Sequence, residues 1–324
     1  MLRIGIIGTG GIADKFARAC HMAKGVTAAA VSSRDRKKGE AFAAEHDIPL
    51  VFEGADNLVS SDEVDAVYVA VPHTAHFENT MLAIKAGKPV LCEKPMCITA
   101  SEAEELFAEA KKRGVLLMEA MWTRLLPNSI LAKRWIDEGR IGKVRYIDSS
   151  FSSLADLDHV LPRLIDPDLA GGALFDVGVY NIEMASYFAG SDPEAWEGFA
   201  EPYCPGVDAS SAMVLKYPGG ILATMRQGFL CPTPCTMTIY GTKGRIELPT
   251  FYAALEARLF VGDTLVEESK TDTALPKGFV YEAEAFRDLV SQGMTTSPVI
   301  PPETTIATAR VMEDLMKSFF PERK

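Results

Sequence analysis

The chain has 324 residues, of which 48% are apolar and 24% are charged, and its formal net charge is -11. This length exceeds the roughly 100–200 residues of a typical domain, so two domains are expected. No apolar run approaches the roughly 18 residues of a membrane-spanning helix, and the negative balance opposes the attraction to phosphates that drives nucleic-acid binding, so we expect a soluble protein with no membrane or nucleic-acid partner.

Short apolar runs alternate with helical patterns in the first third of the chain. Near-continuous runs of this kind are typical of parallel strands that are buried on both faces, and strands are expected at residues 3–7, 26–31, 66–71, 89–92 and 115–118. Helices are expected between them, at residues 12–23, 35–45, 74–86 and 99–113. Gly25, Gly87 and Gly114 stand where C-terminal helix caps belong. This order predicts a doubly wound parallel sheet, whose ligands bind beyond the carboxyl ends of the strands.

The first predicted strand leads into a glycine-rich turn, Gly8-Thr9-Gly10-Gly11-Ile12-Ala13, which matches the pattern GxGxxA. Gly8 permits the tight turn, Gly10 lets the backbone approach a pyrophosphate, and Ala13 keeps the following helix close to the strand. The helix N-terminus supplies free N–H groups and a positive dipole end. We therefore predict that Gly8, Thr9, Gly10, Gly11 and Ile12 bind a dinucleotide; a glycine-rich turn without a ligand is the alternative.

The second predicted strand ends in serines and an arginine rather than in an acidic residue. A site that prefers NAD usually places a carboxylate there, against the ribose hydroxyls. Ser33 and Arg34 suit a 2′-phosphate, because a guanidinium forms charge-assisted hydrogen bonds with phosphate oxygens. NADP is therefore preferred over NAD. Asp35 could contact the ribose if the strand ended one residue later, and its alternative role is to cap the next helix.

The strand at residues 89–92 is followed by Glu93-Lys94-Pro95, on the same rim as the glycine turn. In a partly desolvated cleft, Lys94 could donate a hydrogen bond to a substrate oxygen and stabilise alkoxide character during hydride transfer. The alternative is an ordinary surface lysine at the end of a strand. Its place beside the predicted nucleotide site favours the catalytic reading.

The remainder of the chain has a different texture. Helices are expected at residues 127–138, 176–188, 281–291 and 304–319, and strands at 144–150, 213–217, 221–227, 236–240, 245–247 and 257–260. Turn residues separate these strands, which is typical of an antiparallel sheet. The fold class predicted is therefore α/β, with a Rossmann domain at residues 1–123 and an α+β domain with a largely antiparallel open sheet at 124–324. One face of that sheet needs cover, so we expect a homodimer or higher homo-oligomer.

A second group of candidate residues lies in GGALFDVGVY, residues 171–180, where a glycine turn enters a helix. Asp176 and Tyr180 are four residues apart, which places them on one helix face. A tyrosine with its usual pKa of about 10 needs a nearby cation to act in proton transfer at neutral pH, and Lys94 could provide it. Alternatively, Asp176 only caps the helix and Tyr180 only fills the core.

Three stretches carry a resemblance to a known family: IGIIGTGGIA near the start, HxxHxxxxxxAIKAGKPVLCEKP from His73 to Pro95, and GGALFDVGVY. In this order and spacing they resemble the Gfo/Idh/MocA family of oxidoreductases over nearly the whole chain. MEAMWTRLLP, residues 118–127, is most similar to the dihydrodiol and NADP-dependent D-xylose dehydrogenases of that family.

The resemblance implies an NAD(P)-dependent dehydrogenase that transfers a hydride between nicotinamide C4 and a carbon of a sugar, polyol or trans-dihydrodiol. It assigns proton transfer to Lys94 and Tyr180, with assistance from Asp176, and implies a cis Lys94–Pro95 peptide bond. It also implies that further residues line the cofactor cleft or lie near nicotinamide or substrate, namely Val71, Pro72, His73, Glu93, Trp122 and Arg163.

Other readings stay open at this point. The chain could be a catalytically inactive nucleotide-binding regulator, or a sugar oxidoreductase whose nucleotide does not dissociate. His73 and His76 lack the partners of a zinc site, so no metal is expected. The opening residues do not match a secretory signal, and the six cysteines are scattered, so a cytoplasmic location is expected.

Overall fold

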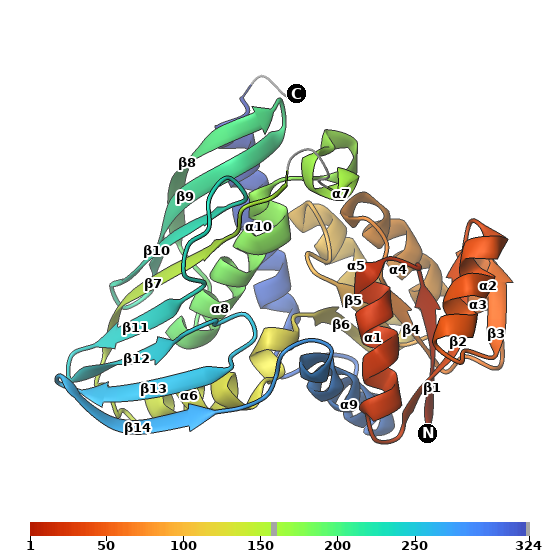
Figure 1. The fold of residues 1–324 in the computed structure, drawn as a ribbon, viewed down its shortest axis with the longest axis horizontal. Helices are drawn as coiled ribbons and strands as arrows, with labels where there is room; N and C mark the ends of the chain where they lie inside the picture. The colour runs from red at the N-terminus through yellow and green to blue at the C-terminus, as the bar shows by residue number, and fades with distance from the viewer. Residues whose placement is uncertain (157–160, 322–324) are drawn as a thin grey trace. The chain divides into compact units, whose positions relative to one another are not determined.

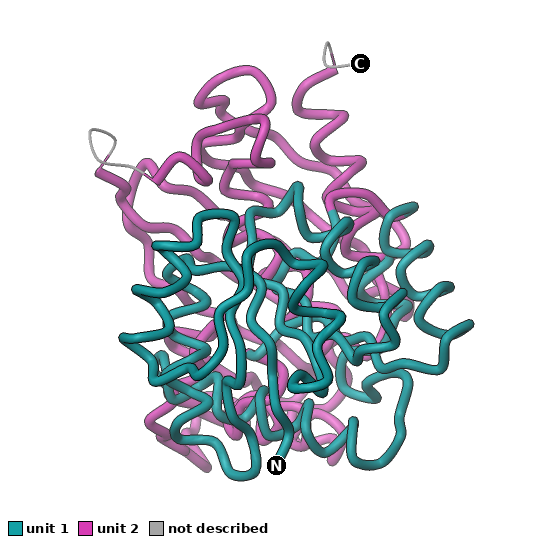
Figure 2. Tube along the Cα trace, turned by 90° about the vertical axis from the view of Figure 1, so that its right-hand side faces the viewer, with its two compact units in different colours: residues 1–97, 101–122, 274–306 teal, residues 98–100, 123–273, 307–324 magenta. Residues whose placement is uncertain are grey.

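The computed structural model describes residues 1–156 and 161–321. The chain divides into two compact units, coloured separately in Figure 2. Unit 1 comprises residues 1–97, 101–122 and 274–306, and unit 2 comprises residues 98–100, 123–273 and 307–324. Residues 274–306 therefore group with the N-terminal segment, although the sequence analysis assigned them to the second domain.

Unit 1 contains a six-stranded parallel sheet in the order β3-β2-β1-β4-β5-β6, which confirms the predicted doubly wound sheet (Figure 1). Its strands are β1 (Leu2–Ile7), β2 (Val26–Ser33), β3 (Leu50–Glu53), β4 (Ala66–Val69), β5 (Val90–Glu93) and β6 (Leu117–Ala120). The four residues of β3 lie at the sheet edge and are only partly buried. This short edge strand lacks the long apolar run that marks the others, and the sequence analysis missed it.

Helices connect the strands of this sheet. They are α1 (Gly11–Met22), α2 (Arg36–Glu45), α3 (Ala55–Val59), α4 (His76–Lys85) after a 3-10 turn at His73–Ala75, and α5 (Ala100–Arg113). The unit also contains α9 (Lys277–Ser291), which contacts α1 and β2. Gly25, Gly87 and Gly114 have φ values of 69°, 76° and 66°, so the predicted C-terminal caps adopt the left-handed conformation that glycine favours. Val67, Val69, Ile84, Val90 and Leu106 are completely buried in the core of the unit.

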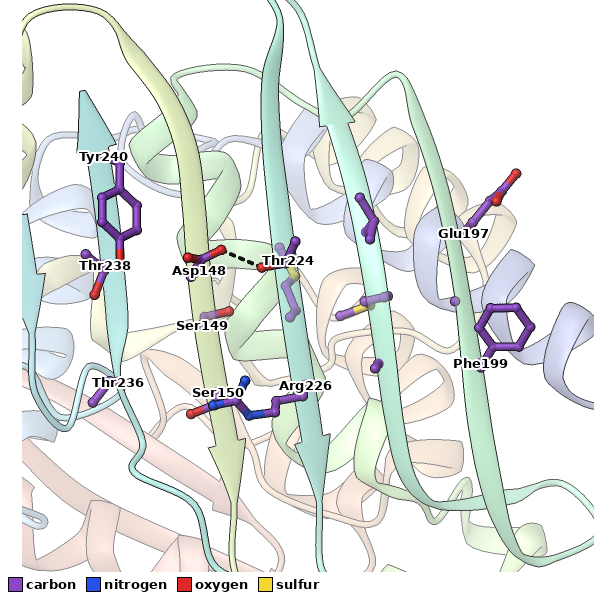
Figure 3. Close-up of a pocket in the computed structure, with 15 residues that line it drawn as sticks. Asp148, Ser149, Ser150, Glu197, Phe199, Thr224, Arg226, Thr236, Thr238 and Tyr240 are labelled. Atoms are coloured by element: carbon purple, nitrogen blue, oxygen red, sulfur yellow. Dashed lines mark hydrogen bonds between the residues drawn. The ribbon is translucent and has the colours of Figure 1, made fainter. Parts of the chain in front are cut away.

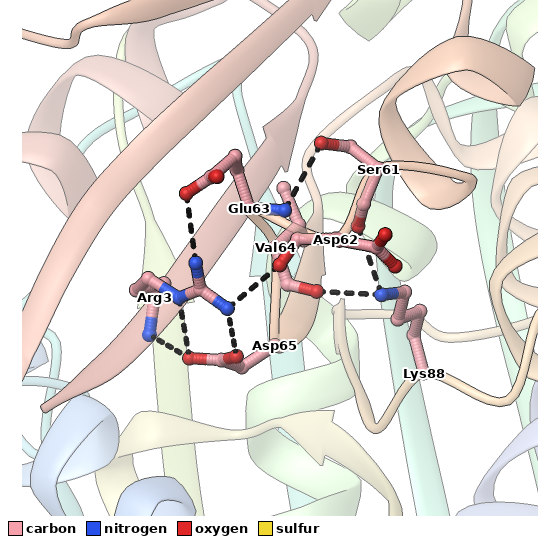
Figure 4. A network of polar contacts seen from close by, with 7 residues as sticks. All are labelled: Arg3, Ser61, Asp62, Glu63, Val64, Asp65 and Lys88. Carbon is pink, nitrogen blue, oxygen red and sulfur yellow. Dashed lines mark hydrogen bonds and ion pairs between the residues drawn. The ribbon is translucent and has the colours of Figure 1, made fainter.

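A partly exposed polar network links β1 to the segment that leads into β4 (Figure 4). The backbone N–H and the Nη2 group of Arg3 donate to the carboxylate of Asp65 at 2.9 and 2.7 Å, and Nη1 donates to Glu63 at 2.8 Å. Lys88 donates to the carbonyl of Val64 at 2.6 Å. The Arg3 guanidinium holds the pKa of the Asp65 carboxyl below its usual range. These contacts lie at the amino ends of the strands, so they support the sheet without entering its ligand-binding edge.

Unit 2 contains an eight-stranded sheet in the order β14-β13-β12-β11-β7-β10-β9-β8. Its strands are β7 (Val144–Ser152), β8 (Ala195–Cys204), β9 (Val207–Tyr217), β10 (Ile221–Gly228), β11 (Met237–Gly241), β12 (Gly244–Leu248), β13 (Glu256–Val261) and β14 (Thr264–Lys270). The sheet is largely antiparallel as predicted, but β7 and β10 pair in parallel. β8 and β14 were missed, because their exposed positions weaken the alternating pattern.

The helices of unit 2 are α6 (Pro127–Asp137), α7 (Pro162–Ile165), α8 (Val179–Ala189) and α10 (Pro302–Phe319), which starts within unit 1. Short 3-10 turns occupy Trp122–Leu125 and Pro167–Leu169, and a π-helical turn spans Leu174–Gly178, directly before α8. α6 packs on β13, and α8 packs on β7 and β10. No helix among the described residues is both long enough and apolar enough to cross a bilayer.

Burial alternates along β9 and β10, so one face of this sheet is buried and the other is exposed. A shallow pocket lies on the exposed face, and the side chains that line it come from neighbouring strands (Figure 3). Thr224 donates to Asp148 across the parallel strands there. None of the residues predicted for catalysis or cofactor binding lines this pocket.

Candidate active site

The glycine turn between β1 and α1 has the geometry of a phosphate site. Gly8 has a φ of 115°, and a Cβ atom there would stand 2.3 Å from the carbonyl oxygen of Ala70, so only glycine fits. A Cβ added at Gly10 or Gly11 would meet nothing within 4 Å. Gly10 is the N-cap of α1 and has no side chain to satisfy the first N–H groups. The residues present therefore fit a pyrophosphate, with open space in front of a helix N-terminus.

The end of β2 separates the roles of three neighbouring residues. The strand ends at Ser33, which is half-buried, and Arg34 is exposed and forms no hydrogen bond or ion pair with the rest of the described chain. Asp35 caps α2, because its carboxylate accepts the N–H groups of Lys37 and Lys38 at 3.0 and 3.2 Å. The alternative role suggested for Asp35 is thus the one that the structure has.

His76 joins two segments that the sequence analysis assigned to the nucleotide cleft. Val71, Pro72 and His73 follow β4 and are partly exposed, whereas His76 is 1% exposed. Its Nδ1 lies 2.8 Å from the carbonyl oxygen of Pro95, and its Nε2 lies 2.9 Å from that of Val71. Burial lowers the pKa of His76 to about 4, so the ring is neutral at pH 7 and its single N–H donates to one of the two carbonyls.

Buried side chains also fix the backbone around Lys94. The Lys94–Pro95 peptide bond is cis, as the resemblance implied. The N–H of Lys94 donates to Glu93 at 3.2 Å, and the N–H of Met96 donates to Glu119 at 2.9 Å. With His76 at the Pro95 carbonyl, three successive residues are held by side chains from β5, β6 and α4. Lys94 itself is half-buried, so its ammonium group extends from a rigid turn.

A second carboxyl group lies near Glu93 in the core of unit 1. The hydroxyl of Tyr68 donates to Glu93, which is 5% exposed. Glu282 on α9 is completely buried, and neither carboxyl oxygen has a hydrogen-bond partner. Burial raises the pKa of Glu282 well above its usual value, and the charge of Glu93 raises it further. The raised pKa of Glu282 favours its neutral, protonated form.

In unit 2 the π-helical turn carries Asp176 and leads into Tyr180. Nη1 of Arg163 lies 2.7 Å from Oδ1 of Asp176, so these two predicted residues form an ion pair. Asp176 therefore has a partner outside its own helix. Single π-helical turns occur often at functional sites, and here Asp176 lies in such a turn whereas Tyr180 lies in the regular helix α8.

The ring of Tyr180 is 8% exposed and lies among other aromatic rings. Its centroid is 5.5 Å from that of Phe151 and 6.5 Å from that of Tyr252. Phe151 and Tyr252 stack on each other at 4.5 Å and are both partly exposed. The arrangement forms an aromatic wall, which suits the apolar face of a ring-shaped substrate.

Two further predictions concern Trp122 and metal binding. Trp122 is 1% exposed and packs edge-on against Phe279 at 5.4 Å in unit 1. One group of possible metal ligands occurs among the described residues, formed by Asp14, Glu45 and His46. Arg18 bonds to both carboxylates, at 2.9 Å to Asp14 and 2.7 Å to Glu45. A guanidinium already supplies the positive charge at this position, so the group does not support a metal site.

Sequence reasoning missed the residues that hold the predicted ones. Glu119 directly follows the strand expected at residues 115–118. Its role is visible only in the structure, where its carboxylate accepts hydrogen bonds from the N–H of Met96 and the hydroxyl of Thr305. The sequence analysis considered His76 as a metal ligand, whereas its ring contacts the backbone carbonyls of Pro95 and Val71. The available signal for both was a polar residue at a buried position of an element next to Glu93-Lys94-Pro95.

Comparison with known proteins agrees with this geometry. Residues 2–121 match the oxidoreductase family with an NAD-binding Rossmann fold, and residues 130–247 match the GFO/IDH/MocA C-terminal domain. The chain is 33% identical over 305 residues to trans-1,2-dihydrobenzene-1,2-diol dehydrogenase of Oryctolagus cuniculus, an alignment that covers 91% of this chain and 92% of the relative.

Solved structures give the same fold. A 3-ketoreductase from Actinomadura kijaniata, in complex with NADP and TDP-benzene, superposes with a TM-score of 0.83 at 26% identity, over 97% of this chain and 96% of that one. Levoglucosan dehydrogenase in complex with NADH gives a TM-score of 0.87 at 20% identity, over 98% and 96% of the two chains. With both units matched, the chain belongs to the Gfo/Idh/MocA family and is an NAD(P)-dependent dehydrogenase that acts on CH–OH groups.

Proposed function

We propose that this enzyme oxidises a carbinol carbon of a sugar, polyol or trans-dihydrodiol, reversibly and with a preference for NADP. The observation that carries the proposal most strongly is the Lys94 turn. It is held by Glu93, His76 and Glu119 at the carboxyl end of β5, the sheet edge at which α1 also begins. Such an edge is where ligands of doubly wound sheets bind. The dihydrodiol dehydrogenase relatives support the substrate class.

The nucleotide is assigned to unit 1. The N–H groups at the start of α1 would hold the pyrophosphate, with contacts from Gly8, Thr9, Gly10, Gly11 and Ile12. Ser33 and Arg34 would hold a 2′-phosphate, since Arg34 is free to turn toward it and Asp35 is engaged at the cap of α2. Val71, Pro72 and His73 would border the dinucleotide beyond β4. A bound nicotinamide supplies or accepts the hydride.

Proton transfer is assigned to Tyr180, supported by Lys94 and assisted by Asp176. The phenolate oxygen of Tyr180 would accept the proton of the substrate hydroxyl during oxidation, and the resulting hydroxyl would return that proton during reduction. A nearby ammonium favours the phenolate and so lowers the pKa of the tyrosine toward neutrality. Phe151 and Tyr252 would exclude water and orient the substrate ring, while Arg163 fixes the carboxylate of Asp176. Trp122 and Arg163 remain assigned near nicotinamide or substrate.

The experiment is a substrate panel followed by two variants. Reduced-nicotinamide absorbance is measured with NADP or NAD and a series of aldoses, inositols and trans-diols. We expect turnover with NADP, and losses of about 100-fold or more in kcat for Lys94→Ala and Tyr180→Phe. Undiminished turnover in both variants would defeat the assignments.

The same material separates the alternatives. An inactive regulator would bind NADPH, seen as a change in nicotinamide fluorescence, and would turn over none of the panel. A protein with a non-dissociating nucleotide would release NAD or NADP when the purified protein is denatured. We expect that the denatured protein releases no nucleotide and that turnover depends on added NADP.

We further propose that the chain forms a homodimer through the exposed face of the sheet in unit 2. Tyr146 lies opposite both Leu222 and Tyr240 in the strand register, so three apolar side chains form a row on that face. Phe199, at 87% exposure, adds a fourth. Apolar rows of this kind mark interaction surfaces. Sedimentation should give the mass of a dimer, and Tyr146→Asp should reduce it to a monomer; a monomeric wild type contradicts the proposal.

A further inference from the structure

A chain of buried hydrogen bonds connects β9 and β10 to the helical segment that carries Asp176 and Tyr180. The N–H of Leu174 donates to both carboxylate oxygens of Asp208 at 3.1 Å. Ser211 donates to Asp208 at 2.7 Å, and Gln227 donates to Ser211 at 2.7 Å. Asn181 donates to Gln227 at 3.0 Å. The chain therefore begins at the first residue of the π-helical turn and returns to the residue after Tyr180.

The glycines of GGALFDVGVY make room for this chain. Gly172 has a φ of 121°, and a Cβ there would stand 2.4 Å from Oδ1 of Asp208. A Cβ at Gly178 would stand 3.2 Å from the side chain of Gln227. Glycines at residues 172 and 178 thus allow Asp208 and Gln227 to approach the helix backbone. These glycines have a packing role, because Asp208 of β9 contacts the start of the helical segment and Gln227 of β10 contacts its end.

The direction of the hydrogen bonds shows which protonation state of Asp208 the hydrogen-bond network requires. Every donor points toward Asp208: the amide of Asn181, the amide of Gln227, the hydroxyl of Ser211 and the N–H of Leu174. Only an ionised carboxylate accepts from all its neighbours without having a proton of its own to donate. Burial raises the pKa of Asp208 to about 6, and the hydrogen bonds from Ser211 and the backbone oppose that rise. At pH 7.5 the residue is therefore a carboxylate.

We propose that Asp208 is a positioning residue for Tyr180, acting as a charged N-terminal cap supplied by a neighbouring strand rather than by the helix itself. A side chain that accepts N–H groups at a helix start stabilises the helix, and a negative charge there also interacts with the helix dipole. The hydrogen-bond network runs from Leu174 through Asp208 to Asn181. Loss of the Asp208 carboxylate therefore loosens the helical segment both before and after Tyr180 in the sequence. The inference rests on the proposed role of Tyr180.

The test compares Asp208→Asn with Asn128→Ala in the full-length protein at pH 7.5. The isosteric amide turns an NH₂ group toward the N–H of Leu174 or the hydroxyl of Ser211, so two donors face each other. Asn128 is equally buried, and its amide donates to Ala254 and Thr271, which do not belong to the hydrogen-bond network of Asp208. Asn128→Ala therefore controls for a general loss of stability in unit 2.

We expect Asp208→Asn to lower kcat about tenfold, with the best substrate of the panel, and to leave the KM for NADP unchanged. Hydrogen exchange of residues 174–181 should become about tenfold faster, because a lost cap opens the helix start. Asn128→Ala should change neither quantity. In the Tyr180→Phe background, Asp208→Asn should add little, since both act on one group.

Wild-type exchange at residues 174–181 in Asp208→Asn, or an unchanged kcat, overturns the inference, and so does a kcat loss that multiplies with that of Tyr180→Phe. Full activity of Tyr180→Phe alone instead overturns the proposed role of Tyr180. The two failures are distinguishable, because the exchange measurement needs no substrate and tests the grip of Asp208 on the helix by itself.

Discussion

His76 should make the stability of the protein fall as the pH drops from about 6.5 to about 4. Its pKa is about 4 in the folded protein, against 6.5 for an unperturbed histidine. The unfolded chain therefore binds a proton in this range that the folded chain refuses. Since a change of one in pKa corresponds to about 1.4 kcal/mol, the loss attributable to His76 approaches about 3 kcal/mol at pH 4 and is absent above about pH 7.

Two variants of His76 test both the direction of the pH dependence of stability and the contacts of the two ring nitrogens. Asn places a donor near the position of Nδ1, and Gln places one near that of Nε2. Both variants should be less stable than the wild type by about 1–2 kcal/mol at pH 7.5, through the lost contact. Near pH 4 the order should reverse, because neither variant can take up the proton. His21→Asn, at an exposed ring, should keep the wild-type dependence.

The measurement is urea unfolding followed by intrinsic fluorescence between pH 4 and 7.5, paired with activity at pH 7.5. His76→Asn should retain more activity than His76→Gln, because Nδ1 faces the carbonyl of Pro95 in the Lys94 turn. Parallel stability curves for wild type and both variants over the whole range would refute the reasoning, since they would show that the buried ring exchanges no proton on unfolding.

Three further variants test unit 1. Gly10→Ala should leave the unfolding temperature within about 2 °C, because its Cβ meets nothing within 4 Å, yet weaken NADPH binding at least about tenfold by blocking the phosphate approach; equal binding by fluorescence titration contradicts this. Arg34→Ala should raise the KM for NADP about tenfold and spare that for NAD, and an equal effect on both would remove the 2′-phosphate assignment. Glu282→Gln should stabilise the protein by about 1–3 kcal/mol at pH 8 and by almost nothing near pH 4, because the raised pKa of the buried acid makes folding less favourable as the pH rises. Thermal unfolding at pH 8 measures this difference. A variant that is less stable than the wild type at that pH would show that Glu282 is not neutral in the folded protein.

Local chemistry in the sequence determined the first half of the fold and supplied the candidate site residues. Apolar runs and glycine caps mark parallel strands and helix ends without reference to the rest of the chain. The glycine turn at Gly8 and the position of Lys94 after a strand follow from the same short-range patterns. Asp35 shows the limit of this reasoning, because a one-residue uncertainty at the strand end left its role open until its cap contacts were seen.

Only the tertiary structure decided which side chains hold those residues in place. Leu174 and Asp208 are 34 residues apart, Met96 and Glu119 are 23 apart, and Glu119 and Thr305 are 186 apart. No periodicity records such pairs, since each partner satisfies its own local pattern equally well with or without the contact. The parallel pairing of β7 with β10 has the same origin: hydrophobic alternation states which face of a strand is buried, whereas the direction of its neighbour depends on how the intervening chain folds back.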